Sequence, residues 1–219
     1  TGADGYPAAM VRTLAYYFTA LVVILDPVGT AALFAGLTRD TGAQYRKRMA
    51  LRGVAIAAGV LLVFAFAGEF ILRALSVSLP AFRIAGGALL FLLAIDMLFA
   101  RQTGFRALTQ SESEEAGESA DISVFPVAIP LIAGPGALTT MVLLMSRAEQ
   151  EAPGPTGVIL VLLAVLGITL ILLLLASRVV KLLGMTGVNV ITRVLGILLA
   201  AIAVQLILDG VNAGIFLKV

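Results

Sequence analysis

The chain has 219 residues, of which 60% are hydrophobic and 13% are charged, and its mean hydropathy is +1.07. A soluble domain is about half apolar and about a quarter charged, so a soluble fold of this length could not bury the excess apolar surface. Composition therefore excludes an ordinary soluble enzyme and a disordered protein. Because one membrane span needs about 20 apolar residues, the length suits six spans with about 100 residues left for loops and ends.

The sequence contains no cysteine and no histidine, two residue types that often form catalytic and metal-binding sites. It therefore has no disulfide, no thiolate nucleophile, and neither the commonest metal ligand nor the usual proton shuttle near neutral pH. We expect no enzyme activity, no metal and no cofactor, and we leave a proton or a sodium ion open as a coupling ion. The net charge of +2 comes with basic residues beside apolar spans, which does not suggest a nucleic-acid partner.

The first half contains three apolar segments. The first, at about 11–37, is interrupted by the sequence Asp26-Pro27-Val28-Gly29, and a polar stretch follows at 38–52. We predict a second span at about 53–72 and a third at about 81–100, with a short turn between them that ends at Pro80. The polar residues 101–121 form one long loop, whose acidic part, 111–121, we expect to be mobile.

The second half also contains three apolar segments. The fourth begins near Ile122 and contains Pro126, Pro130 and the sequence Gly134-Pro135-Gly136. After a turn at 149–155 we predict a fifth span at about 156–176 and a sixth at about 188–208. The expected fold is an all-α polytopic membrane protein with six transmembrane helices, of which the first and the fourth are broken.

The distribution of Lys and Arg predicts the orientation of the chain. With alternating spans, nine of the 15 basic residues fall on one side: Arg39, Arg46, Lys47, Arg48, Arg52, Arg101, Arg106, Arg178 and Lys181. Four fall on the other side: Arg12, Arg73, Arg147 and Lys218. The excess predicts that the two termini of the chain both lie outside.

Matching motifs indicate an internal repeat. Pro27 and Pro135 lie in Gly/Pro breaks 108 residues apart, and the motif that begins at Arg83 returns at Arg193, 110 residues later. Two matches at nearly the same offset favour a repeat over chance, although Gly and Pro are frequent in membrane helices. Since each half has three spans, the halves run oppositely through the bilayer, as in many secondary transporters. We predict repeats at 1–110 and 122–219 in one membrane domain, joined by the acidic loop at 111–121.

The two breaks are candidate parts of a binding site. A proline inside a helix removes a donor and frees an upstream carbonyl, and freed groups persist in a membrane only when buried in protein or lining a cavity. The start of a half-helix suits a carboxylate, and the free carbonyls suit an ammonium group or a cation. Two breaks that meet at a pseudo-twofold axis would fit an α-amino acid. A simple kink at each proline is the alternative.

Asp26 is the carboxylate placed within the first break. It could hold a substrate ammonium, bind a coupling cation or carry a proton, or it could cap the half-helix that begins at the next residue. The candidate substrate-binding residues are Asp26, Pro27, Gly29, Thr30, Gly134, Pro135, Gly136, Thr139 and Thr140. Arg83, Arg193, Gly86 and Gly196 are candidates for structural or gating roles.

Three segments of the chain resemble the MarC family of integral membrane proteins. They are the break Asp26-Pro27-Val28-Gly29-Thr30, the stretch Phe82–Leu98 and the stretch Val124–Thr140. The resemblance covers nearly the whole chain except the N-terminal tail and the acidic loop. The chain departs from the family pattern at Asp26, where we expect Asn.

The family includes SnatA-type transporters of small neutral amino acids such as glycine and alanine. The resemblance therefore implies a six-span inner-membrane protein whose partners are a small neutral amino acid and the lipid bilayer. The alternative is an exporter of another small solute, such as a basic amino acid, a drug or an ion. A membrane enzyme would need a nucleophile and base or a metal cluster, and a regulatory membrane protein would have no use for paired breaks.

Overall fold

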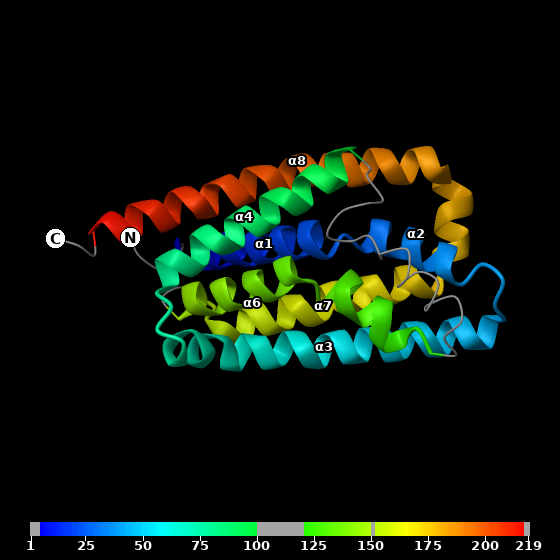
Figure 1. Cartoon of the computed structure of the whole chain (residues 1–219), viewed down its shortest axis with the longest axis horizontal. Helices are drawn as coiled ribbons and strands as arrows, with labels where there is room; N and C mark the ends of the chain where they lie inside the picture. Colours follow the sequence, from blue (N-terminus) through cyan, green and yellow to red (C-terminus); the bar gives the residue numbers. More distant parts are fainter. Residues whose placement is uncertain (1–4, 100–120, 150–151, 217–219) are drawn as a thin grey trace.

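The computed structural model describes residues 5–99, 121–149 and 152–216. In these ranges the chain is a bundle of helical segments that run mostly along one long axis (Figure 1). The segments are α1 (Gly5–Leu25), α2 (Pro27–Leu37), α3 (Ala43–Ala74), α4 (Leu79–Phe99), η1 (Ser123–Ile132), α6 (Pro135–Ala148), α7 (Pro155–Leu174) and α8 (Ala176–Phe216).

The described helices have the length and composition of membrane spans. Five of them can cross a membrane, counting α1 and α2 together, and a sixth results if η1 and α6 form one span bent by 57°. Large apolar side chains such as Phe66 and Phe70 of α3 are exposed on the outside of the bundle, where lipid would cover them. The predicted fold class, an all-α polytopic membrane protein, is confirmed.

The predicted break in the first span lies at a single residue. α1 ends at Leu25, Asp26 has left-handed backbone angles (φ 42°, ψ 68°), and α2 begins at Pro27. Proline favours this first helical position because its missing N–H group would have no helical partner there. Asp is one of the few residues besides glycine that adopts the left-handed conformation readily.

The fourth span is more irregular than a single kink. In η1, Phe125 and Ile129 have extended backbone angles, and each of them precedes a proline in cis. A proline disfavours the helical conformation of the residue before it, so the two prolines divide η1 into short turns. The chain is extended again at Gly134 before α6 begins at Pro135.

Two helices extend beyond the spans that hydropathy marks. α3 begins at Ala43 rather than near Gly53, because its basic first turns contain neither glycine nor proline to stop the helix. α8 begins at Ala176, where we expected a loop before a span at Val188. Its axis is kinked at Gly184, whose backbone angles (φ 64°, ψ 169°) only glycine adopts without strain.

The helices α4 and α8 pack against each other in a reciprocal way. A Cβ atom on Gly87 would lie 2.7 Å from both the Ala203 carbonyl oxygen and Ile207 Cγ1. A Cβ atom on Gly196 would lie 3.0 Å from Met97 Cβ. Met97 and Ile207 are 110 residues apart, the offset of the predicted repeat, and two-fold related elements make such contacts. The proposed boundary between the repeats, at 111–121, lies almost wholly outside the described residues.

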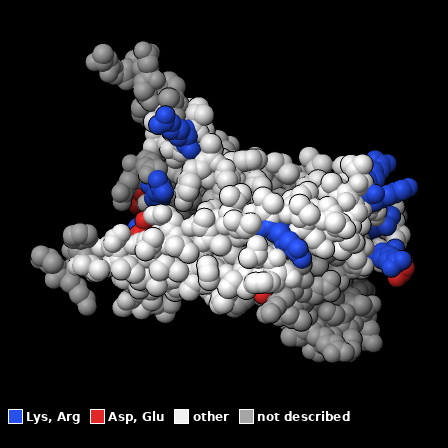
Figure 2. Space-filling model, turned by 90° about the horizontal axis from the view of Figure 1, so that it is seen from above, with Lys and Arg blue, Asp and Glu red and all other residues white. Residues whose placement is uncertain are grey.

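The two ends of the bundle differ in charge. Both ends of the chain lie at one end of the bundle, and the connections from α2 to α3 and from α7 to α8 lie at the other (Figure 1). Lys and Arg gather at the latter end (Figure 2).

Candidate functional site

The first break satisfies its own polar groups. Asp26 is 0% exposed, and its Oδ1 atom accepts a hydrogen bond of 3.0 Å from the Gly29 N–H group. The Thr30 hydroxyl donates to the Leu25 carbonyl at 2.9 Å, so a side chain also covers the end of α1. The interpretation of Asp26 as the cap of α2 is confirmed, and its roles toward a substrate or a cation stay predictions.

Gly29 allows this cap to form. A Cβ atom at this position would overlap Oδ2 of Asp26, so a larger residue would push the carboxylate away from the start of α2. Pro27, Gly29 and Thr30 are all buried with Asp26. The first break is therefore a closed polar unit inside the bundle.

The second break lacks such a cap. The residue before α6 is Gly134, which has no side chain to accept a hydrogen bond from the first N–H groups of the helix. Its carbonyl accepts from Leu138 N–H at 3.0 Å. The start of α6 thus presents the partial positive charge of a helix N-terminus with no side-chain cap among the described residues.

A cavity lies against this uncapped helix start. Gly134, Pro135, Gly136 and Ala137 line it together with Ile24, which is two residues from Asp26 and brings the first break to its wall. The other lining residues are Leu89, Leu93, Pro130, Leu131 and Ile132. Its volume is about 20 Å³, room for about one water molecule. In this conformation the cavity is therefore too small for an amino acid.

The structure brings together only some of the predicted site residues. Gly134, Pro135 and Gly136 line the cavity, whereas Asp26, Pro27, Gly29 and Thr30 lie in the neighbouring break and do not. Thr139 and Thr140, which follow the second break in α6, are also buried. A binding role for this set stays a prediction.

The two threonines that follow the second break differ in their surroundings. Thr139 points its methyl group at Gly86 of α4, where a Cβ atom would overlap it. The Thr140 hydroxyl oxygen is buried and has no hydrogen-bond partner among the described residues. Thr139 therefore packs two helices together, and Thr140 offers a donor that the described part of the chain does not use.

The residues with predicted gating roles lie away from the cavity. Arg83 is half-buried near the start of α4, and Arg193 is exposed on α8. Gly86 is in contact with α6, and Gly196 with α4. The two glycines form close contacts between helices, and gating by any of the four residues stays a prediction.

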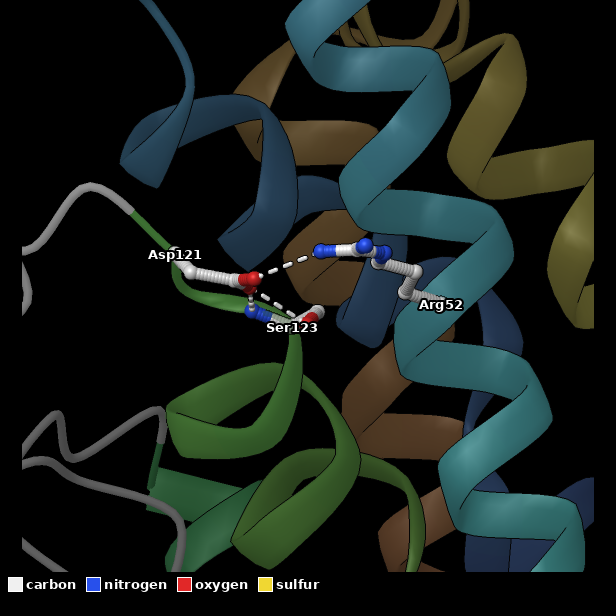
Figure 3. Close-up of polar contacts among 3 residues, drawn as sticks. All are labelled: Arg52, Asp121 and Ser123. Carbon is white, nitrogen blue, oxygen red and sulfur yellow. Dashed lines mark hydrogen bonds and ion pairs between the residues drawn. The ribbon is translucent and has the colours of Figure 1, made fainter.

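A polar cluster at the start of η1 was not foreseen. Arg52 Nη1 lies 2.9 Å from Asp121 Oδ2, and Asp121 Oδ1 accepts hydrogen bonds from the Ser123 N–H and hydroxyl groups (Figure 3). These hydrogen bonds from Ser123, with the charge of Arg52, hold the pKa of Asp121 below its usual value of 3.8. The cluster ties the start of η1 to α3. The sequence Asp-x-Ser before an apolar run was the available signal, since it is typical of a helix cap.

The lowered pKa of Asp121 predicts a pH-dependent contribution to stability. The ionised carboxylate stabilises the fold above the unfolded-state pKa, near 3.8, and this contribution is lost as the pH falls through the lower folded-state pKa. Because the side chains of Arg52 and Asp121 are 49% and 44% exposed, we expect Asp121→Asn to cost at most about 1 kcal/mol at pH 7. Thermal unfolding in detergent should show this difference shrinking below pH 3.8, and a difference constant with pH would contradict the assignment.

Together the helices, the broken spans and the buried backbone site define a polytopic α-helical membrane protein with discontinuous spans. A family model described as MarC family integral membrane protein matches residues 11–215. The chain belongs to this family, as the sequence motifs predicted.

Proteins from bacteria and archaea are similar to nearly the whole chain. The UPF0056 membrane protein MJ1677 of Methanocaldococcus jannaschii is 38% identical over 198 residues, which are 90% of this chain and 95% of that protein. The UPF0056 inner membrane protein YhgN of Escherichia coli K12 is 38% identical over 88% of this chain and 92% of its own length. The UPF0056 membrane protein YvbG of Bacillus subtilis is 32% identical over 93% and 96% of the two chains. No solved structure matches the chain.

Proposed function

We propose that this protein is a secondary transporter of small neutral amino acids, such as glycine and alanine, across the inner membrane. The observation that carries the proposal is the uncapped start of α6, which lines a small cavity beside the first break. Discontinuous helices of this kind form the substrate sites of many secondary transporters.

The two breaks differ in a way that favours a carboxylate ligand. At the first break, the Asp26 carboxylate accepts from the Gly29 N–H group at the start of α2. At the second break, the equivalent position before α6 is a glycine. A substrate carboxylate would occupy at α6 the place that Asp26 occupies at α2, where the helix N-terminus favours negative charge.

The lining of the cavity favours a small ligand and transport rather than catalysis. All ten lining residues are apolar residues, glycine or proline, so they offer no nucleophile or general base. The cavity volume of about 20 Å³ is too small for an amino acid, so loading requires the helices around it to separate. One three-span repeat moving against the other would expose the site alternately to the two sides, without a cofactor and with a proton or a sodium ion as the candidate coupling ion.

We also propose that both termini face outward. The basic end of the bundle carries Arg39, Arg46, Lys47, Arg48, Arg52, Arg178 and Lys181 among the described residues. The positive-inside rule assigns such an end to the cytoplasm. The termini lie at the opposite end (Figure 1).

Counterflow with the purified full-length protein in proteoliposomes tests the function. We expect liposomes preloaded with glycine or alanine to accumulate labelled glycine, and liposomes preloaded with lysine or arginine not to do so. Imposed proton and sodium gradients should then identify the coupling ion, because only the coupled gradient drives net uptake. Counterflow of a basic amino acid without glycine would instead support the alternative exporter, and movement of neither would contradict transport of amino acids.

A further inference from the structure

The basic end of the bundle contains cations that form no ion pair with an acidic side chain in the part of the chain that the structure describes. Among the described residues, the ion pair at this end joins Arg52 to Asp121, and the other ion pair joins Arg73 to Glu69 elsewhere. Arg46, Arg178 and Lys181 make no ion pair within the described part of the chain. Figure 2 shows that Lys and Arg side chains gather at this end.

The first turns of α8 lie across this end of the bundle. Before the kink at Gly184 the helix runs at an angle to the rest of α8 (Figure 1). Ala176 is buried and anchors the segment, whereas Leu182 is 86% exposed. A short helix with basic residues and exposed apolar residues at a membrane boundary is typical of a segment that lies in the lipid interface.

A contact with α3 places several donors together on this segment. Arg46 Nη1 donates a hydrogen bond of 3.5 Å to the Ser177 hydroxyl. Lys181 is four residues after Ser177, so the two side chains share one face of the helix. The guanidinium, the hydroxyl and the ammonium group therefore lie on the same side of the segment, and such donors suit a phosphate.

We propose that this surface, formed by Arg46, Ser177, Lys181 and Leu182, binds the phosphate of an anionic phospholipid such as phosphatidylglycerol. The phosphate lies between Arg46 and Lys181, and the acyl chains cover Leu182. Leu182 follows Lys181 directly in the helix and is exposed, which favours a lipid over a free phosphate ion, because a free phosphate would leave this apolar side chain in water. The lipid would hold the start of α8 against α3.

Lipid titration of the purified full-length protein in a neutral detergent tests the proposal by native mass spectrometry. We expect phosphatidylglycerol to bind more tightly than phosphatidylcholine. Each cation contributes about 1 kcal/mol near an anionic lipid, so the double variant Arg46→Gln/Lys181→Gln should lose about 25-fold in affinity. Arg46→Gln alone should lose about fivefold, which keeps the test informative if the double variant does not fold.

The matched control is Lys47→Gln/Arg48→Gln, which removes the same charge from the same end. Both residues are exposed on α3, and neither makes the contact with Ser177. A much smaller loss in this control than in Arg46→Gln/Lys181→Gln supports the site, whereas equal losses would overturn it in favour of diffuse attraction. Inorganic phosphate at millimolar concentration should not displace the lipid, and full displacement would overturn the lipid as the ligand.

Discussion

The variant Gly136→Val is expected to abolish uptake of glycine and alanine while the protein still folds. A Cβ atom on Gly136 would lie 2.7 Å from Leu90 Cδ2 and 3.4 Å from Leu93 Cδ2. These atoms are the ends of flexible side chains and can move, but the added branches would fill a cavity of about 20 Å³. Displacing a carboxylate from the start of α6 forfeits charge-assisted hydrogen bonds of about 1.5–3 kcal/mol, or about tenfold to hundredfold in affinity.

Counterflow in proteoliposomes measures the loss, and thermal unfolding in detergent verifies the fold. Gly59→Val in α3 is the matched control, because Gly59 is exposed and a Cβ atom there meets nothing within 4 Å. We expect the control to retain wild-type uptake, and Gly136→Ala to fall between the two. Wild-type uptake by Gly136→Val would place the substrate elsewhere.

Replacing Asp26 should separate its capping role from a role of its charge. Asp26→Ala removes the acceptor for the buried Gly29 N–H group and leaves an alanine in left-handed backbone angles. The lost cap and the strained backbone together should destabilise the protein by about 2–4 kcal/mol. Asp26→Asn keeps an acceptor oxygen and tolerates these angles, so we expect it to fold with a loss below about 1 kcal/mol.

Uptake by the folded Asp26→Asn variant tests whether the negative charge of Asp26 is needed for transport. We expect Asp26→Asn to transport glycine, since the carboxylate is already engaged in the cap and Asn is the residue that the family pattern predicts. A folded Asn variant without uptake would show that the negative charge acts on the substrate or on a coupling ion. Equal melting temperatures for the wild type and Asp26→Ala would contradict the claim that Asp26 stabilises the protein by capping α2.

The sequence predicted the parts of the fold that local signals determine. Pro27 and Pro135 mark the breaks because a proline within an apolar span removes a helical hydrogen bond and clashes with the preceding turn. The apolar runs mark the spans because the lipid core requires apolar side chains. Hydropathy does not report where a helix ends outside the membrane, so the early starts of α3 and α8 were missed. The segment at 177–187, before Val188, is helical because it contains no residue that breaks a helix before Gly184.

The site was predicted less completely, because its geometry depends on distant segments. Arg52 and Asp121 are 69 residues apart, and their contact leaves no local pattern. Thr139 follows the second break as a site residue would, yet Gly86 of α4 receives its methyl group. Gly134 and Gly136 line the cavity because both flank the proline at the start of α6, and their role in binding a substrate stays a prediction.

The reciprocal packing of α4 and α8 has a consequence for how the molecule changes shape. A Cβ atom on Gly87 would lie 2.7 Å from the Ala203 carbonyl oxygen, whereas one on Gly196 would lie 3.2 Å from that of Ala94. The two ends of this helix pair are thus unequally tight. For a transporter built from the two inverted repeats that we predict, the opposite-facing state would arise when the repeats exchange conformations. The tighter approach would then pass from Gly87 to Gly196, and the helix pair would act as a pivot between two equivalent arrangements.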